Sequence, residues 1–265
     1  MKPILTLTAL ALLLHCCALS AAPTDSAPGN TRQVASIEYR VVGKQPRSRK
    51  YFVQGLEIRN GSLYQGTGMR GQSGIQVFDL ESGQMQQSRR LSRKLFGEGI
   101  TVLGDQVVQL TWRSRRAFVY DRADLSLQSE FRIPGEGWGL TNDGEQLIYS
   151  DGSAHLHFID PSSWRIERSL QVTRNGIPLQ YLNELEWTPD YLLANVWGDD
   201  AVYMIDLDNG EVIGEIDLRG LLPAAQRKPT TDVLNGIAID PSSGLLWVTG
   251  KYWPAIYQIE LGSPP

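Results

Sequence analysis

Five short stretches of this chain repeat one pattern: Gln54-Gly55-Leu56-Glu57, Glu98-Gly99-Ile100-Thr101, Trp138-Gly139-Leu140-Thr141, Asn183-Glu184-Leu185-Glu186 and Asn235-Gly236-Ile237-Ala238. In each stretch a small or polar pair precedes an apolar strand start. The second residues of the stretches lie 44, 40, 45 and 52 positions apart, and the longest interval contains a polar, Pro-containing insertion at 220–232. A period of 40 to 45 residues, with room for about four strands, is typical of one blade of a β-propeller.

The sequence between the repeats predicts short strands and tight turns. Alternating runs such as Ala201–Ile205 and Ala255–Leu261 are separated by turn dipeptides such as Asn60-Gly61. Four of the repeats are followed by a strand pattern that ends in Asp, at Asp79, Asp121, Asp160 and Asp206. We therefore predict an all-β, five-bladed propeller. The strand pattern at 37–42 precedes the first repeat, so we expect it to complete the last blade and close the ring, which removes open sheet edges.

The N-terminus predicts a secretory signal peptide over 1–22. Lys2 is followed by an apolar stretch at 4–19 and by small residues at 20–22. A lipoprotein signal, with Cys16 or Cys17 as the modified residue, is the alternative, but His15 stands where a small residue is expected. We interpret residues 23–33 as a flexible leader and 34–265 as a single propeller domain in the periplasm or outside the cell, without a membrane partner once the signal is removed. Both cysteines fall in the removed segment, so the mature chain has no thiol for a disulfide, a nucleophile or a metal.

The charge balance argues against nucleic acid as a partner. The 265 residues include 25 Lys and Arg against 29 Asp and Glu, a net charge of −4. Basic residues do cluster at 47–50, 89–94 and 113–116, and we interpret these clusters as solvated loops.

Two columns of equivalent residues predict a ligand site. The first residues of the five repeats are Gln54, Glu98, Trp138, Asn183 and Asn235, and a purely structural column would repeat one residue type. A second column lies nine residues before the end of a later strand in the last four blades and holds Trp112, Asp151, Trp197 and Lys251, whereas the equivalent stretch of the first blade, 67–74, is irregular and Gly-rich. Because equivalent positions of a propeller surround one channel mouth, the columns predict a pocket with aromatic walls, a carboxylate, amides and a lysine.

Nine motifs in register resemble the plant-type and bacterial glutaminyl cyclases. They include Tyr51-Phe-Val-Gln-Gly-Leu-Glu57, Phe96-Gly-Glu-Gly-Ile-Thr101, Leu182-Asn-Glu-Leu-Glu186 and Val248-Thr-Gly-Lys-Tyr-Trp-Pro254, and the match runs from about residue 40 to 261. The resemblance implies cyclisation of N-terminal glutaminyl residues of peptides and proteins to 5-oxoproline, with release of ammonia and without a required cofactor. It implies Glu98 as the proton shuttle, Asn183 and Lys251 as oxyanion donors, Trp112, Trp138 and Trp197 as aromatic walls, and Phe52 and Gln54 as contacts of the substrate amino end. We expect a monomer.

The sequence leaves alternative bases, metal sites and functions open. Glu57 and Glu186 are alternative bases, although neither falls at the mouth-facing place of the repeat. His155 and His157 make a poor zinc site without a third ligand. Members of the resembled family sometimes carry calcium near the channel, and no calcium-loop spacing occurs here. The rival functions are a propeller-type metal-dependent lactonase or hydrolase, using Glu57, Asn183 and Asn235, and a non-catalytic module that docks peptides.

Overall fold

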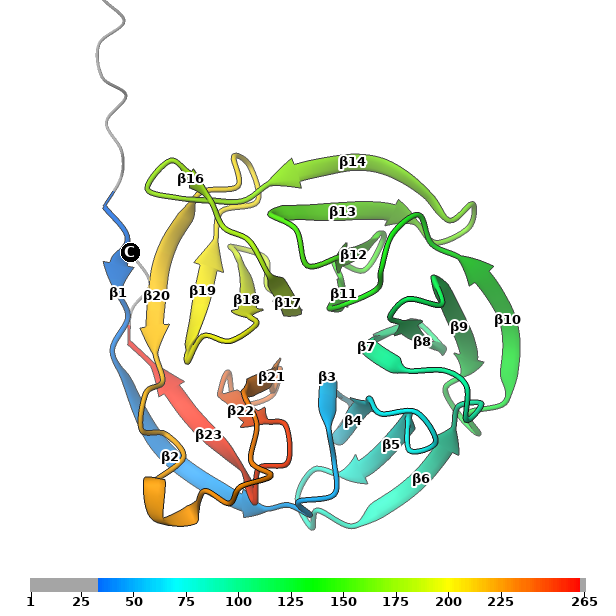
Figure 1. Cartoon of the computed structure of the whole chain (residues 1–265), viewed down its shortest axis with the longest axis horizontal. Coiled ribbons are helices and arrows are strands. Elements are labelled where there is room, and N and C mark those ends of the chain that lie inside the picture. The colour runs from blue at the N-terminus through cyan, green and yellow to red at the C-terminus, as the bar shows by residue number, and fades with distance from the viewer. Residues whose placement is uncertain (1–32, 263–265) are drawn as a thin grey trace, which may run out of the picture. The chain divides into compact units, whose positions relative to one another are not determined.

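The computed structural model describes residues 33–262 of the chain. The expected signal peptide, both cysteines and nearly all of the expected leader lie outside the described residues. Five sheets surround a central axis, and each runs from an inner strand to an outer one (Figure 1). The prediction of an all-β, five-bladed propeller is confirmed.

Successive stretches of sequence form successive blades, and β15 (Thr173–Arg174) with β16 (Ile177–Pro178) forms a small hairpin outside them. Blade 1 consists of β3 (Val53–Arg59), β4 (Ser62–Thr67), β5 (Gly74–Asp79) and β6 (Met85–Arg90). Blade 2 consists of β7 (Gly97–Leu103), β8 (Gln106–Thr111), β9 (Arg116–Asp121) and β10 (Leu127–Arg132). Blade 3 consists of β11 (Leu140–Asn142), β12 (Leu147–Ser150), β13 (His155–Asp160) and β14 (Arg165–Gln171). Blade 4 consists of β17 (Leu182–Trp187), β18 (Leu192–Val196), β19 (Ala201–Ile205), β20 (Val212–Asp217) and β1 (Ala35–Ser36). Blade 5 consists of β21 (Leu234–Ile239), β22 (Leu246–Gly250), β23 (Ala255–Leu261) and β2 (Tyr39–Pro46).

The N-terminal strands join two different blades. β1 runs parallel to β20, and Ile37 N–H continues this contact by donating to Glu215 O at 2.8 Å. The chain then crosses to blade 5, where β2 pairs antiparallel with β23 from Tyr39 to Pro46. This strand therefore begins two residues later than the expected 37–42 and extends further, because residues 35–37 follow the edge of blade 4. The insertion at 220–232 forms a loop with one short 3₁₀ turn, η1 (Ala224–Gln226).

The hydrophobic core is divided among the interfaces between neighbouring blades. Ile148 and Phe158 of blade 3 pack with Leu185 of blade 4, for example, and Leu193 of blade 4 packs with Ile237 of blade 5. Equivalent clusters join blades 1 and 2, blades 2 and 3, and blades 5 and 1. Because every blade buries both faces, its middle strands are almost continuously buried rather than alternating.

The repeated glycine has a steric origin. A Cβ on Gly55 would lie 2.6 Å from Ile100 N, and one on Gly99 would lie 2.6 Å from Leu140 N. A Cβ on Gly139 would lie 1.8 Å from Asn183 O. The inner strands of adjacent blades therefore meet backbone to backbone at these positions, which a side chain would prevent.

In blade 4 the position of the repeated glycine is occupied by Glu184, whose carboxyl group bonds to the neighbouring blades. Glu184 Oε1 accepts from Leu56 N–H at 3.0 Å, and Oε2 accepts from Ile237 N–H at 2.7 Å. The fully buried side chain thus bonds blade 4 to blades 1 and 5. Burial raises the pKa of Glu184 well above its usual range.

Candidate active site

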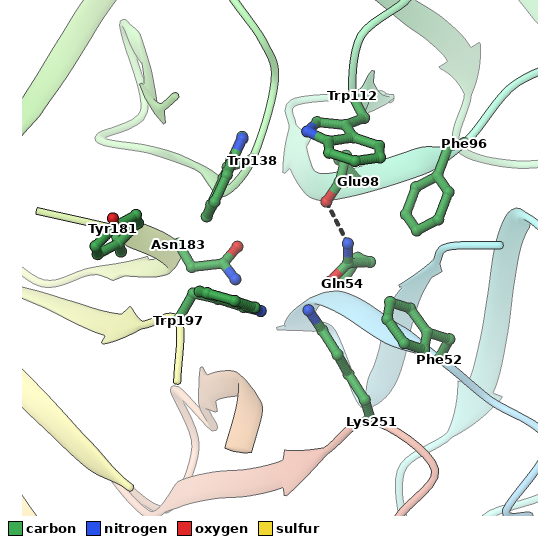
Figure 2. Close-up of a pocket in the computed structure, with 10 residues that line it drawn as sticks. All are labelled: Phe52, Gln54, Phe96, Glu98, Trp112, Trp138, Tyr181, Asn183, Trp197 and Lys251. Atoms are coloured by element: carbon green, nitrogen blue, oxygen red, sulfur yellow. Dashed lines mark hydrogen bonds between the residues drawn. The ribbon is translucent and has the colours of Figure 1, made fainter. Parts of the chain in front are cut away.

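One end of the channel opens into a cavity of about 280 Å³ whose walls are aromatic and whose floor is polar (Figure 2). Its lining residues come from all five blades: Phe52, Gln54, Phe96, Glu98, Trp112, Trp138, Tyr181, Asn183, Trp197 and Lys251.

The origin of each side chain follows a simple rule. Gln54, Glu98 and Asn183 lie within the inner strands β3, β7 and β17, one residue after each strand begins. The aromatic residues and Lys251 lie just outside strands. Directly before an inner strand stand Phe52, Phe96 and Tyr181, and Trp138 precedes β11 by two residues. Directly after the second strand of a blade stand Trp112, Trp197 and Lys251. Because the first two strands of a blade are antiparallel, the start of one and the end of the other meet at the same face of the ring.

Glu98 is the central acidic group of the cavity. Its side chain is 4% exposed, and Gln54 Nε2 donates to its Oε2 at 2.5 Å. Asn235 Nδ2 lies 3.4 Å from Gln54 Oε1, which orients the Gln54 amide so that its NH₂ group faces Glu98. Burial raises the pKa of Glu98 well above its usual range, Lys251 opposes this rise, and the negative charge of Glu136 adds to it.

Lys251 and Asn183 carry unused donors and acceptors into the same space. Lys251 is 4% exposed, and its ammonium lies 4.8 Å from the centre of the Phe52 ring. The ammonium group has no hydrogen-bond or ion-pair partner in the part of the chain that the structure describes. Burial lowers the pKa of Lys251, and Glu98 opposes this effect. The buried Oδ1 of Asn183 likewise lacks a partner among residues 33–262. Polar groups buried in this way are available for a ligand.

Ring contacts join the aromatic walls in two groups. The rings of Phe52 and Phe96 are 5.9 Å apart edge to face, and Phe96 lies 5.5 Å from Trp112. On the other side, Tyr181 and Trp197 are 6.1 Å apart and are both more than half exposed at the rim. The cavity is thus closed by apolar surface except at its polar floor and its mouth.

Comparison with known proteins identifies the family and the architecture. The family model for glutamine cyclotransferase matches residues 8–261. A glutaminyl-peptide cyclotransferase of Arabidopsis thaliana is 38% identical over 230 residues, which cover 84% of this chain and 71% of the plant protein. The crystal structure of Myxococcus xanthus glutaminyl cyclase superposes with a TM-score of 0.80 at 32% identity, covering 86% of this chain and 98% of the other. The chain belongs to the glutamine cyclotransferase family. The resemblance inferred from the sequence motifs is confirmed, and with it the assignment of the chain as an enzyme of a family that cyclises glutamine.

The eight site residues predicted from the sequence of this cyclotransferase all lie around the one cavity: Phe52, Gln54, Glu98, Trp112, Trp138, Asn183, Trp197 and Lys251. Two further members of the columns do not line it. The carboxylate of Asp151 turns towards His157 Nε2, at 3.2 Å, and accepts from Ser153 N–H at 3.0 Å. Burial opposes ionisation of Asp151, but these hydrogen bonds outweigh it and lower its pKa to about 2. Asn235 does not reach the cavity but contacts Gln54, because its Nδ2 donates to Gln54 Oε1 at 3.4 Å.

Three residues at the site were not predicted from the sequence: Phe96, Tyr181 and Glu136. Phe96 and Tyr181 stand two residues before Glu98 and Asn183, as Phe52 stands two residues before Gln54. Side chains two apart near a strand start point to the same side, so this spacing is a signal that could have found them. Glu136 occupies the same position relative to Trp138, and it accepts hydrogen bonds from two of the tryptophan walls.

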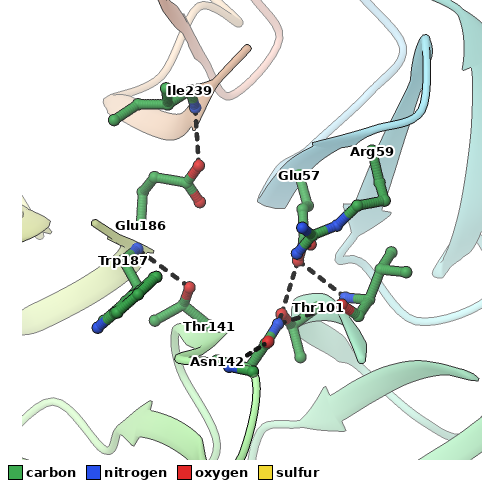
Figure 3. Close-up of polar contacts among 10 residues, drawn as sticks. Glu57, Arg59, Thr101, Thr141, Asn142, Glu186, Trp187 and Ile239 are labelled. Atoms are coloured by element: carbon green, nitrogen blue, oxygen red, sulfur yellow. Dashed lines mark hydrogen bonds and ion pairs between the residues drawn. The ribbon is translucent and has the colours of Figure 1, made fainter. Parts of the chain in front are cut away.

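The alternative bases lie at the other end of the channel (Figure 3). Glu57 Oε2 accepts from Thr101 Oγ1 at 2.6 Å and from Val102 N–H at 2.8 Å, and Glu186 Oε1 accepts from Ile239 N–H at 2.7 Å. Both side chains therefore bond an inner strand to the next blade, the role that Glu184 has further inside. The rival ligand set does not converge, because Glu57 lines this far cavity and Asn183 lines the first one.

The channel carboxyl groups are engaged in hydrogen bonds within the protein. Both oxygens of Glu57 and both of Glu184 already accept hydrogen bonds, as does Oε1 of Glu186. Residues 33–262 contain no cluster of three or more His, Cys, Asp or Glu side chains that could hold a metal ion. No helix within residues 33–262 has the length and apolar character needed to cross a membrane.

Proposed function

We propose that this protein converts N-terminal glutaminyl residues of peptides and proteins to 5-oxoproline and releases ammonia. The observation that carries the proposal is the shared cavity of Glu98, Lys251 and Asn183 inside aromatic walls. A cavity of about 280 Å³ is small for a ligand pocket, which suits one residue of a peptide end rather than a longer segment.

Glu98 is proposed to move the proton that the reaction transfers. The neutral α-amine of the substrate attacks the carbonyl carbon of its own side-chain amide, so a C–N bond forms within the residue. The attacking nitrogen gives up a proton to the Glu98 carboxylate, and the leaving nitrogen receives a proton from it as the second C–N bond breaks. The products are the lactam and ammonia, and the carboxylate is regenerated. The raised pKa of Glu98 suits both roles, because it brings the affinity for the proton closer to neutral pH.

Lys251 and Asn183 are proposed to stabilise the tetrahedral intermediate. Negative charge develops on the amide oxygen, and the Lys251 ammonium and the Asn183 side chain supply N–H donors towards the same space (Figure 2). In a cavity walled by tryptophan, such donors act with little competition from water. The aromatic walls also hold the side chain folded, and Phe52 and Gln54 contact the amino end.

We propose that the reaction needs no metal ion, because Glu98 supplies the proton transfer and Lys251 the positive charge. Activity that survives prolonged treatment with a strong chelator would support this. All five blades of one chain contribute lining residues to the cavity, which supports a monomer as the active form. The predicted signal peptide would place the activity in the periplasm or outside the cell.

The test is incubation of the purified protein with a Gln-initiated dipeptide while ammonia and peptide mass are followed. The expected result is release of ammonia with an equal loss of mass from the peptide. A peptide that begins with Glu is the matched control, because it lacks the amide leaving group. Well-folded protein that leaves the Gln dipeptide unchanged would contradict the proposal.

A further inference from the structure

Exposed basic side chains gather on the loops of blades 1 and 2 that border the substrate cavity. The loop that ends at Phe52 carries Lys50, the loop that ends at Phe96 carries Arg93 and Lys94, and the loop that begins at Trp112 carries Arg115. Arg70 lies on the loop between β4 and β5, and Arg90 ends β6. We call these six residues the basic rim: Lys50, Arg70, Arg90, Arg93, Lys94 and Arg115.

The loops of the basic rim are in contact with one another and with the cavity wall. Arg70 Nε donates to Lys94 O at 3.3 Å, and Leu91 N–H donates to Ser73 O at 3.0 Å. The backbone at Gly68 lies directly against both Phe52 and Phe96, where a Cβ would approach their rings to less than 3 Å. The basic rim is therefore held beside the aromatic wall rather than on separate projections.

A second depression adjoins the cavity at Phe52, on the side of the basic rim. It has a volume of about 190 Å³, and Phe52 lines both it and the substrate cavity. Lys50 and Arg90 line it together with the polar side chains of Gln72, Gln76 and Ser88. A chain that leaves the substrate cavity past Phe52 thus meets two cations and several hydrogen-bonding groups.

The basic rim lacks internal neutralisation. Arg113 and Arg116, on the same side of the ring, are each paired with a glutamate, at 3.3 Å and 3.2 Å. None of the six basic-rim residues forms an ion pair within residues 33–262. The chain as a whole is acidic, with a net charge of −4, so its overall composition does not account for this concentration of positive charge at the cavity. Unpaired charge next to a binding cavity attracts ligands of opposite sign.

We propose that the basic rim binds acidic side chains in the residues that follow the N-terminal glutamine. The preferred substrates are then peptides and proteins whose first few positions after Gln carry Asp or Glu. The residues directly after Gln leave the cavity beside the basic rim once Gln occupies the cavity, and an extended peptide advances about 3.3 Å per residue. This inference rests on the proposed function and specifies its substrate class.

The experiment compares two peptides of equal length, Gln-Glu-Glu-Ala-Ala and Gln-Gln-Gln-Ala-Ala, both amidated at the C-terminus. For the unaltered protein, kcat/KM is expected to be higher for the acidic peptide, and the preference is expected to shrink as salt is raised from about 0.05 M to about 0.5 M. Charge reversal in Arg93→Glu/Lys94→Glu is expected to lower kcat/KM for the acidic peptide by about fivefold or more, and to change the uncharged peptide much less.

The matched control is Arg165→Glu, at the start of β14 on the opposite face of the ring, where an exposed charge forms no ion pair within residues 33–262. It is expected to leave the ratio of the two kcat/KM values unchanged. An equal ratio in the unaltered protein and in the double variant would overturn the inference while leaving the cyclase function intact. Failure of the unaltered protein to turn over either peptide would instead contradict the proposed function.

Discussion

Glu136 and Trp112 are joined by a hydrogen bond in which the indole Nε1 donates to Glu136 Oε2 at 2.6 Å. The same oxygen accepts from Trp138 Nε1 at 3.2 Å, so one carboxylate sets the orientation of two walls. Its negative charge also raises the pKa of Glu98. Glu136 therefore influences both the shape of the cavity and the proton affinity of its central acid, although it is not among the lining residues.

Replacement Glu136→Gln separates these two effects. The amide oxygen can still accept from both indoles, while the negative charge is lost. The pKa of Glu98 should then fall, and the acid limb of the kcat/KM profile against pH should move to lower pH, because Glu98 loses its proton earlier. The substrate amine titrates identically in both proteins, so the shift reports the enzyme. In Glu136→Ala both indoles lose their acceptor, and a raised KM is expected in addition. An unshifted acid limb in Glu136→Gln would show that the charge does not reach Glu98.

Replacement Lys251→Met should shift the same limb in the opposite direction. The Lys251 ammonium lowers the pKa of Glu98, so its removal should raise that pKa and move the acid limb to higher pH. At the pH optimum kcat should fall about 10²- to 10³-fold, as for loss of an oxyanion donor, with a smaller change in KM. A change confined to KM would reassign Lys251 to ground-state binding.

Replacement Glu98→Gln should abolish turnover while preserving the fold. An amide cannot carry the proton, so kcat should fall at least about 10²-fold. Folding raises the pKa of Glu98 above its usual 4.5, so the folded state holds the proton more tightly than the unfolded chain. The stability due to Glu98 is complete below pH 4.5 and decreases as the pH rises through the folded-state pKa. Gln does not titrate, so the Tm of the variant minus that of the unaltered protein should grow over this range. A constant difference would contradict the raised pKa.

Replacement Glu184→Gln should destabilise the ring. Glu184 offers acceptors to Leu56 N–H and Ile237 N–H, whereas a glutamine amide has one oxygen and leaves one of these buried donors unpaired. The expected cost is about 1 to 3 kcal/mol, measured by urea denaturation. Asp208→Asn, in the exposed turn between β19 and β20, is a control that changes a carboxylate to an amide without burial.

The sequence predicted the blades because a propeller repeats one unit. The repeated glycine and the Asp residues that end a strand in most blades are spaced at nearly regular intervals. The sequence predicted seven residues of the cavity because equivalent strand positions face one channel, and it predicted Phe52 from the family resemblance alone. It did not predict Glu136, because a carboxylate at this position departs from the aromatic residues that stand there in blades 1, 2 and 4. The sequence also did not predict that Trp112 lines the cavity whereas Asp151, at the equivalent position, does not. Asp151 is turned away by a hydrogen bond to His157, in a neighbouring strand of the same blade. Burial and pairing of individual carboxyl groups are properties of the folded ring.

The division of the site between strands and loops has a consequence for how such an enzyme can diversify. The proton-transferring carboxyl group and its amide partners belong to inner strands that are locked to both neighbouring blades, where almost any substitution disturbs the ring. The surfaces that meet the rest of a substrate belong to connecting segments, which can change length and charge without moving that framework. Selectivity for different protein N-termini can therefore be altered by exchanging connecting segments, provided that Lys251 and the aromatic walls, which such segments also carry, are kept.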